Sequence, residues 1–106
     1  MAKKPPKYKL RYSPLFYEDV TKIIDYVLLE LKNEQAAKML VDNTEAAIKK
    51  RLANPLSSPV YKSLNGRKHA YRRILLGNYL IFYVVIEDTM VVRRMLYGRR
   101  DIDRIL

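Results

Sequence analysis

Cysteine is absent from this 106-residue chain, histidine occurs once and glycine occurs three times. Without cysteine the chain has no disulfides, no thiol nucleophile and no thiolate ligands for zinc. The single histidine, His69, excludes metal sites built on paired histidines and leaves at most one imidazole base. Three glycines are too few for the glycine-rich loops that hold phosphate groups. The composition therefore predicts a protein that uses no cofactor and no metal.

Long apolar runs are missing as well. No window approaches the roughly 20 apolar residues of a membrane span, and the basic N-terminus lacks the apolar stretch of a signal peptide. Hydrophobic residues make up 49% of the chain, which is enough for a packed core. We therefore expect one cytoplasmic domain over residues 1–106, with residues 1–6 as a disordered tail, and no membrane partner.

Positive charge is in excess: 21 Lys and Arg against 11 Asp and Glu give a formal net charge of +10. Such an excess favours a polyanionic partner, either nucleic acid or an acidic protein, although it also suits a merely solvated basic surface. The basic residues form three clusters, which are Lys3, Lys4, Lys7, Lys9 and Arg11, then Lys62, Arg67, Lys68, Arg72 and Arg73, and finally Arg93, Arg94, Arg99, Arg100 and Arg104. Asp101 and Asp103 are interpreted as ion-pair partners within the third cluster.

The N-terminal half predicts a strand followed by a helical hairpin. Residues 7–12 alternate basic with apolar side chains, which is the period of a half-buried strand. Ser13 and Pro14 supply a helix cap and a first-turn proline, and apolar residues at three- and four-residue spacing predict a helix over about 14–32. Asn33 caps a second helix, which the sequence Ala53-Asn54-Pro55 ends.

The C-terminal half predicts three antiparallel strands over 69–76, 79–86 and 90–97, after an irregular segment at 56–68. Tight turns at Gly77-Asn78 and at 87–89 make the strands a meander, and the run 79–86, apolar on both faces, is its central strand. The first turn sets Ile74 opposite Ile81 and Arg72 opposite Tyr83. Arg72 and Arg73 then lie on opposite faces of the sheet, and the sequence leaves open which face the helices cover. The fold class is α+β.

Few residues offer acid–base chemistry. No two carboxylates are predicted to converge, and His69 at the start of a strand is interpreted as structural or exposed. Arginine and lysine can stabilise the dianionic transition state formed when a ribose 2′-hydroxyl attacks its own phosphodiester, and they need no metal for it. Nine tyrosines could stack on bases, but tyrosine also favours half-buried strand positions. A metal-free ribonuclease and a protein that only binds an acidic partner both remain open.

The order of strand, helical hairpin, three-stranded meander and basic tail resembles the RelE/ParE superfamily of toxins from type II toxin–antitoxin systems. The resemblance covers about residues 7–106. Residues 77–85 (GNYLIFYVV) are similar to the family's central strand G-x-Y-x-I-x-Y-x-V, and residues 95–102 (MLYGRRDI) are similar to the ParE-type ending L-H-G-x-R-D, with Tyr97 in place of the histidine. Residues 61–66 fit the loop before the meander.

The resemblance implies one of two toxic activities. ParE-like members poison DNA gyrase without nuclease residues, whereas RelE-like members cleave mRNA on the 70S ribosome. The nucleases carry an arginine after the tyrosine of the central strand, where this chain has Leu80, and a tyrosine near the C-terminus, where it has Leu106. They also use an arginine just after the last strand, which Arg100 could match. Two apolar positions favour the ParE-like activity, and either class implies a cognate antitoxin with an acidic, flexible segment.

Each activity implies its own site residues. For a gyrase inhibitor the predicted contacts are Arg93, Arg94, Tyr97, Arg99, Arg100 and Arg104. For a nuclease the predicted RNA-binding residues are Lys62, Arg67, Lys68 and Arg72, and the predicted catalytic residues are Arg73, Tyr97 and Arg100. A third possibility is a silent family member that only binds its antitoxin.

Overall fold

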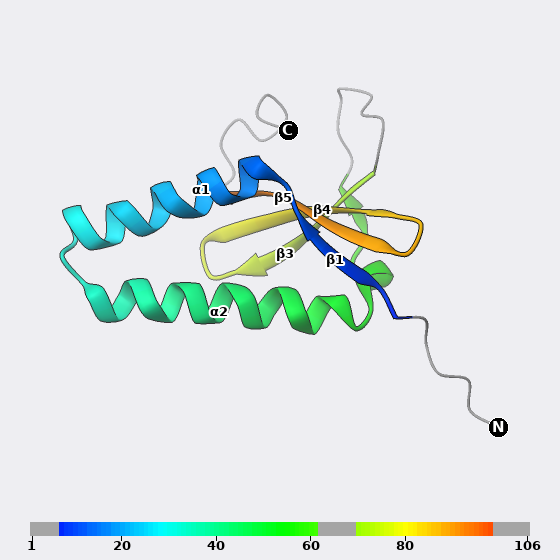
Figure 1. Cartoon of the computed structure of the whole chain (residues 1–106), viewed down its shortest axis with the longest axis horizontal. Coiled ribbons are helices and arrows are strands. Elements are labelled where there is room, and N and C mark those ends of the chain that lie inside the picture. The colour runs from blue at the N-terminus through cyan, green and yellow to red at the C-terminus, as the bar shows by residue number, and fades with distance from the viewer. Residues whose placement is uncertain (1–6, 62–69, 99–106) are drawn as a thin grey trace.

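The computed structural model describes residues 7–61 and 70–98, which form an antiparallel pair of helices on one side of a sheet (Figure 1). The elements in chain order are β1 (Lys9–Tyr12), α1 (Pro14–Asp25), the π-helical turn η1 (Tyr26–Glu30), α2 (Glu34–Leu52), the 3₁₀ turn η2 (Pro55–Ser57), β2 (Val60–Tyr61), β3 (Tyr71–Leu76), β4 (Tyr79–Ile86) and β5 (Thr89–Tyr97). Neither helix in the described ranges is long and apolar enough to cross a membrane.

The sheet has five strands in the order β1-β5-β4-β3-β2. β1 lies parallel to β5, and the other neighbours are antiparallel. The α+β class, the N-terminal strand, the helical hairpin and the three-stranded meander are therefore confirmed. β4 is the central strand, and residues 80–84 are all buried. A parallel neighbour requires a long crossover, which the helical hairpin between β1 and the meander provides.

The register of β3 and β4 is the predicted one. Leu76 pairs with Tyr79, Ile74 with Ile81 and Arg72 with Tyr83. The structure also settles which face the helices cover: Phe16 and Ile48 from the helices pack with Ile74, Ile81 and Tyr83 in the main core. The outer face holds a second, smaller cluster, in which Leu80 and Phe82 are buried against Tyr71 and Leu96.

The first helix changes type in its last turn. The chain is helical without a break over 14–30, close to the predicted 14–32, but its last turn is π-helical: the Leu31 N–H donates to the Tyr26 carbonyl at 3.2 Å. The left-handed backbone of Lys32, with φ of 50°, then reverses the chain. The cap of the second helix is confirmed, since the Asn33 side chain accepts a hydrogen bond from the Ala36 N–H at 2.9 Å.

The prediction of an irregular segment over 56–68 is wrong at the start of that segment. Residues 55–57 form η2, and Val60 and Tyr61 pair with Arg72 and Tyr71 as β2. Two residues are too few for a periodic signal, so the pairing comes from the neighbouring strand rather than from local propensity. The rest of the segment, 62–69, lies outside the described residues.

A buried tyrosine hydroxyl joins this segment to the sheet. Tyr83 is 0% exposed, and its hydroxyl donates to the Pro55 carbonyl at 2.5 Å. Because that donation uses its only proton, the hydroxyl accepts from Ser58 Oγ at 2.9 Å and from Arg51 Nη1 at 3.2 Å. Arg51 Nη1 also donates to the Arg73 carbonyl at 2.9 Å. The end of α2, η2 and the sheet thus share one polar centre.

Replacing Tyr83 by phenylalanine should lower the free energy of unfolding by about 1–3 kcal/mol, because the buried Pro55 carbonyl and the Ser58 hydroxyl lose their partner. Urea denaturation followed by circular dichroism measures the change. Tyr97→Phe is the matched control, because Tyr97 is 63% exposed. Removing its hydroxyl should leave the midpoint of urea unfolding unchanged. Equal midpoints for both variants would refute this role of Tyr83.

Candidate functional site

Two consecutive arginines occupy a β-bulge in β5. Arg94 pairs with Phe82 and Val92 pairs with Tyr83, so Arg93 is the extra residue opposite the β4 backbone. Met90, Val92 and Met95 all pack in the helix-covered core. The bulge therefore resets the alternation of β5, and both arginines fall outside that core.

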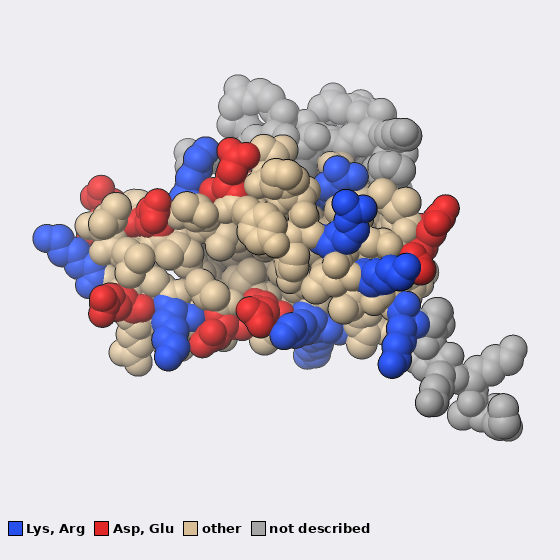
Figure 2. All heavy atoms as spheres, in the orientation of Figure 1, with Lys and Arg blue, Asp and Glu red and all other residues tan. Residues whose placement is uncertain are grey.

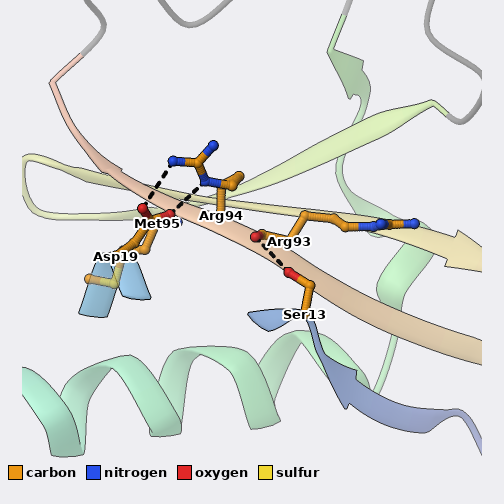
Figure 3. Close-up of polar contacts among 5 residues, drawn as sticks. All are labelled: Ser13, Asp19, Arg93, Arg94 and Met95. Atoms are coloured by element: carbon orange, nitrogen blue, oxygen red, sulfur yellow. Dashed lines mark hydrogen bonds and ion pairs between the residues drawn. The ribbon is translucent and has the colours of Figure 1, made fainter. Parts of the chain in front are cut away.

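Arg94 is held by a carboxylate from α1. Its Nε donates to Asp19 Oδ2 at 2.7 Å and its Nη2 donates to Asp19 Oδ1 at 3.0 Å (Figure 3). The Arg94 and Asp19 side chains are 18% and 11% exposed. The hydrogen bond that Arg94 donates to Asp19 raises the pKa of Arg94, although burial partly opposes this. Asp19 also accepts from the Met95 N–H at 3.0 Å, so a single carboxylate holds both a side chain and the strand backbone.

The start of α1 replaces β1 along the free edge of β5. The β1 ladder ends where Tyr12 pairs with Val92. Beyond it the Ser13 N–H donates to the Val92 carbonyl at 2.9 Å, and Ser13 Oγ donates to the Arg93 carbonyl at 2.8 Å. Ser13 stands at the predicted N-cap position, but its hydroxyl makes no cap hydrogen bond, because the bulge carbonyl takes it.

Arg72 and Arg73 lie on opposite faces of the sheet, as predicted. Arg72 Nη1 donates to the carbonyl of Ser58, and to that of Leu56 at 3.4 Å, so it links β3 to η2. Arg73 stands in one cross-strand row of the outer face with Phe82 and Arg94. The outer face thus carries Arg73 and Arg94 on either side of Phe82, and Arg93 lines a cavity with Arg94, whereas Arg72 lies on the opposite face.

Tyr97 lies on the other face, at the end of the sheet. It pairs with Tyr79, with ring centroids 5.2 Å apart in an edge-to-face arrangement. Burial, and secondarily the proximity of Tyr97, raise the pKa of Tyr79 above its ordinary value. Both rings line an apolar groove of about 550 Å³ with Tyr26 and Leu31 from the hairpin. Tyr97 and Arg73, two of the predicted nuclease residues, are therefore not brought together.

Six predicted site residues lie outside the described residues: Lys62, Arg67, Lys68, Arg99, Arg100 and Arg104. The same holds for His69, for the Asp101 and Asp103 ion-pair interpretation, and for the expected tail at 1–6. Within residues 7–61 and 70–98, no three His, Asp or Glu side chains are grouped so that they could hold a metal ion.

The sequence profile described as the ParE toxin of the type II toxin–antitoxin system parDE matches residues 10–102. This chain belongs to the ParE toxin family. It is thus a type II toxin of the RelE/ParE superfamily, as the resemblance implied. Among curated proteins, no sequence matches this ParE-family chain.

Solved structures share the fold of this ParE-family toxin. A chain of the chromosomal ParDE system from P. aeruginosa superposes with a TM-score of 0.69 at 14% identity, over 90% of this chain and 100% of that one. The E. coli DinJ-YafQ toxin–antitoxin complex gives 0.54 at 16% identity, over 86% and 92%. The archaeal RelE-RelB complex from Pyrococcus horikoshii gives 0.51 at 13%, over 89% and 98%. At these identities the likeness concerns the fold alone.

Charge on the helical face of this ParE-family toxin is mixed. Acidic and basic side chains alternate along the helices, whereas basic ones gather over β1 (Figure 2). Lys49 pairs with Glu45 at 3.1 Å on α2, and Lys9 of β1 pairs with Asp88 at 3.7 Å. All four side chains are more than half exposed, so these pairs contribute little to stability.

Sequence reasoning missed Asp19 and Arg51 as the partners that hold the arginine-bearing strands. The Asp19 carboxylate faces Arg94, which is 75 positions away in the sequence. One signal was available: two adjacent arginines interrupt the alternation of residues 90–95, and such an interruption is typical of a bulge.

Replacing Asp19 by asparagine should lower the free energy of unfolding by about 3 kcal/mol, because a largely buried guanidinium loses its counter-charge. The exposed pair on α2 supplies a matched control: Glu45→Gln should change stability by less than about 0.5 kcal/mol. Urea denaturation of the three proteins measures both effects. If Asp19→Asn and Glu45→Gln unfold at the same urea concentration, the pair does not hold β5.

Proposed function

We propose that this toxin inhibits growth by acting on DNA gyrase and that a cognate antitoxin neutralises it. The observation that carries the gyrase target is the environment of Leu80. In the mRNA-cleaving branch that the sequence resembles, an arginine follows the tyrosine of the central strand, whereas here Leu80 is 3% exposed and packs beside Phe82. An arginine at this position would bury an unpaired charge, so the packing is incompatible with that catalytic group.

The separation of Arg73 and Tyr97 supports the same choice. A metal-free nuclease needs its cationic and proton-transferring groups within hydrogen-bond reach of one phosphodiester. Arg73 lies on the outer face in the row of Phe82, and Tyr97 packs on Tyr79 at the end of the opposite face. Of the target contacts expected from the sequence, Tyr97 is the most accessible described one, at 63% exposure.

Two observations support an antitoxin partner: the net positive charge of the chain, and the toxin–antitoxin origin of the solved structures with the same fold. A net charge of +10 favours a partner with an acidic segment. The P. aeruginosa structure is described as a ParDE system, and the E. coli structure as a toxin–antitoxin complex. We extend this partnership to the present chain and place the toxin in the cytoplasm, where gyrase acts.

Induced expression of the chain alone should arrest growth, and co-expression of the protein encoded beside it should restore growth. In vitro, the purified toxin should inhibit gyrase supercoiling and leave mRNA intact on programmed 70S ribosomes. Codon-phased mRNA cleavage with active gyrase would establish the nuclease instead. Normal growth after induction would establish a silent, antitoxin-binding member.

Arg100→Ala should abolish growth arrest without changing the melting temperature, because Arg100 is a predicted target contact. Lys38→Ala removes one positive charge from an exposed position of α2 and is the matched control. Both variants are compared by growth after induction and by thermal denaturation. Undiminished toxicity of Arg100→Ala would remove this residue from the target surface.

A further inference from the structure

The guanidinium groups of the two arginines in the bulge differ in their hydrogen-bond partners. The Arg94 guanidinium donates to the Asp19 carboxylate. Arg93 is held through its main-chain carbonyl, which accepts from Ser13, while its buried Nε has no hydrogen-bond partner. Its side chain extends away from Asp19 along the sheet (Figure 3). A desolvated N–H donor without an acceptor is rare in native proteins, and it is commonly explained by a missing partner.

A cavity of about 280 Å³ lies beside this side chain, between the start of α1 and strands β3 and β5. Arg93 and Arg94 line it together with Leu15, Glu18 and Tyr71. Since Asp19 already neutralises Arg94, Arg93 contributes the charge that a ligand would meet. Leu15 is half exposed and offers an apolar contact next to the guanidinium.

We propose that Arg93 anchors one carboxylate of an acidic side chain on the antitoxin, an inference that rests on the proposed function. A guanidinium presents Nε and one Nη to a carboxylate as a fork of two parallel donors, so a small shift of the side chain on docking would give the unpaired Nε its acceptor.

The lining of the cavity favours a protein carboxylate over a nucleic-acid backbone. Glu18 places a negative charge in the cavity, which opposes a dianionic phosphate or a series of phosphodiesters more than it opposes a single carboxylate. The apolar side chain of Leu15 suits a peptide better than a sugar–phosphate chain.

Titration calorimetry with the protein encoded beside the toxin gene tests the anchor. Arg93→Met keeps the apolar stem and removes the unpaired donor, so it should fold normally and bind about 10- to 100-fold more weakly, the range for a lost charge-assisted hydrogen bond. Arg93→Lys keeps the charge but not the fork and should recover only part of the affinity. Lys38→Met, the matched loss of one exposed charge on α2, should stay within about twofold of the wild type.

Replacing the acidic residues of the antitoxin one at a time by their amides then locates the carboxylate. One amide variant of the antitoxin should bind the wild-type toxin more weakly. It should cause no further loss of affinity for Arg93→Met, whereas its effect on affinity should add to that of Lys38→Met. Equal affinities of Arg93→Met and Lys38→Met would contradict the anchor alone and leave the proposed function standing. A wild-type toxin that does not bind this protein would contradict the antitoxin itself. Loss of binding to a single-stranded RNA oligonucleotide, with antitoxin binding unchanged, would assign Arg93 to nucleic acid instead.

Discussion

The adjacent arginines of β5 impose the constraint on which this sheet depends. A regular strand alternates its side chains, so a strand with Val92 in the core would bring Arg94 into the core as well. The bulge at Arg93 prevents this and returns Met95 to the core. A bulge, however, leaves backbone groups without ladder partners. Ser13 satisfies the Arg93 carbonyl and Asp19 satisfies the Met95 N–H, so the start of α1 completes the edge that β1 leaves open.

The arginines of the sheet and of α2 differ in what their guanidinium groups bind. Arg94 donates to the Asp19 carboxylate, and Arg72 donates to main-chain carbonyls that precede β2. Arg51 donates to the Tyr83 hydroxyl and to the Arg73 carbonyl. Net charge alone cannot distinguish these arginines from a binding surface, because a structural cation and a docking cation count equally in the sum. Hydrogen-bond partners distinguish them, and Arg93 is set apart because its Nε has none.

Much of the fold could be predicted from the sequence wherever one local rule decides it. The two-residue turn at Gly77-Asn78 fixes every pair between β3 and β4, and Gly77 adopts the positive φ of 59° that such turns require. What was missed depends on contacts between distant residues. The partner of Asp19 is 75 positions away, and β2 exists only because β3 is beside it. The site was predictable as a set of arginines but not in its division between the two faces of the sheet, which depends on the bulge.

Two polar centres hold the helical hairpin on the sheet, one at the start of α1 and one at the end of α2. Asp19 binds β5 at the first, and Arg51 with Tyr83 binds the second to the middle of the sheet. The hairpin extends past the sheet at its other end, around η1 (Figure 1). Tyr26, Leu29 and Leu31 are more than half exposed there, and Tyr26 and Leu31 also line the groove beside Tyr79 and Tyr97. The same two polar centres hold the hairpin on one face of the sheet. They therefore keep its exposed apolar side chains away from the arginines of the outer face.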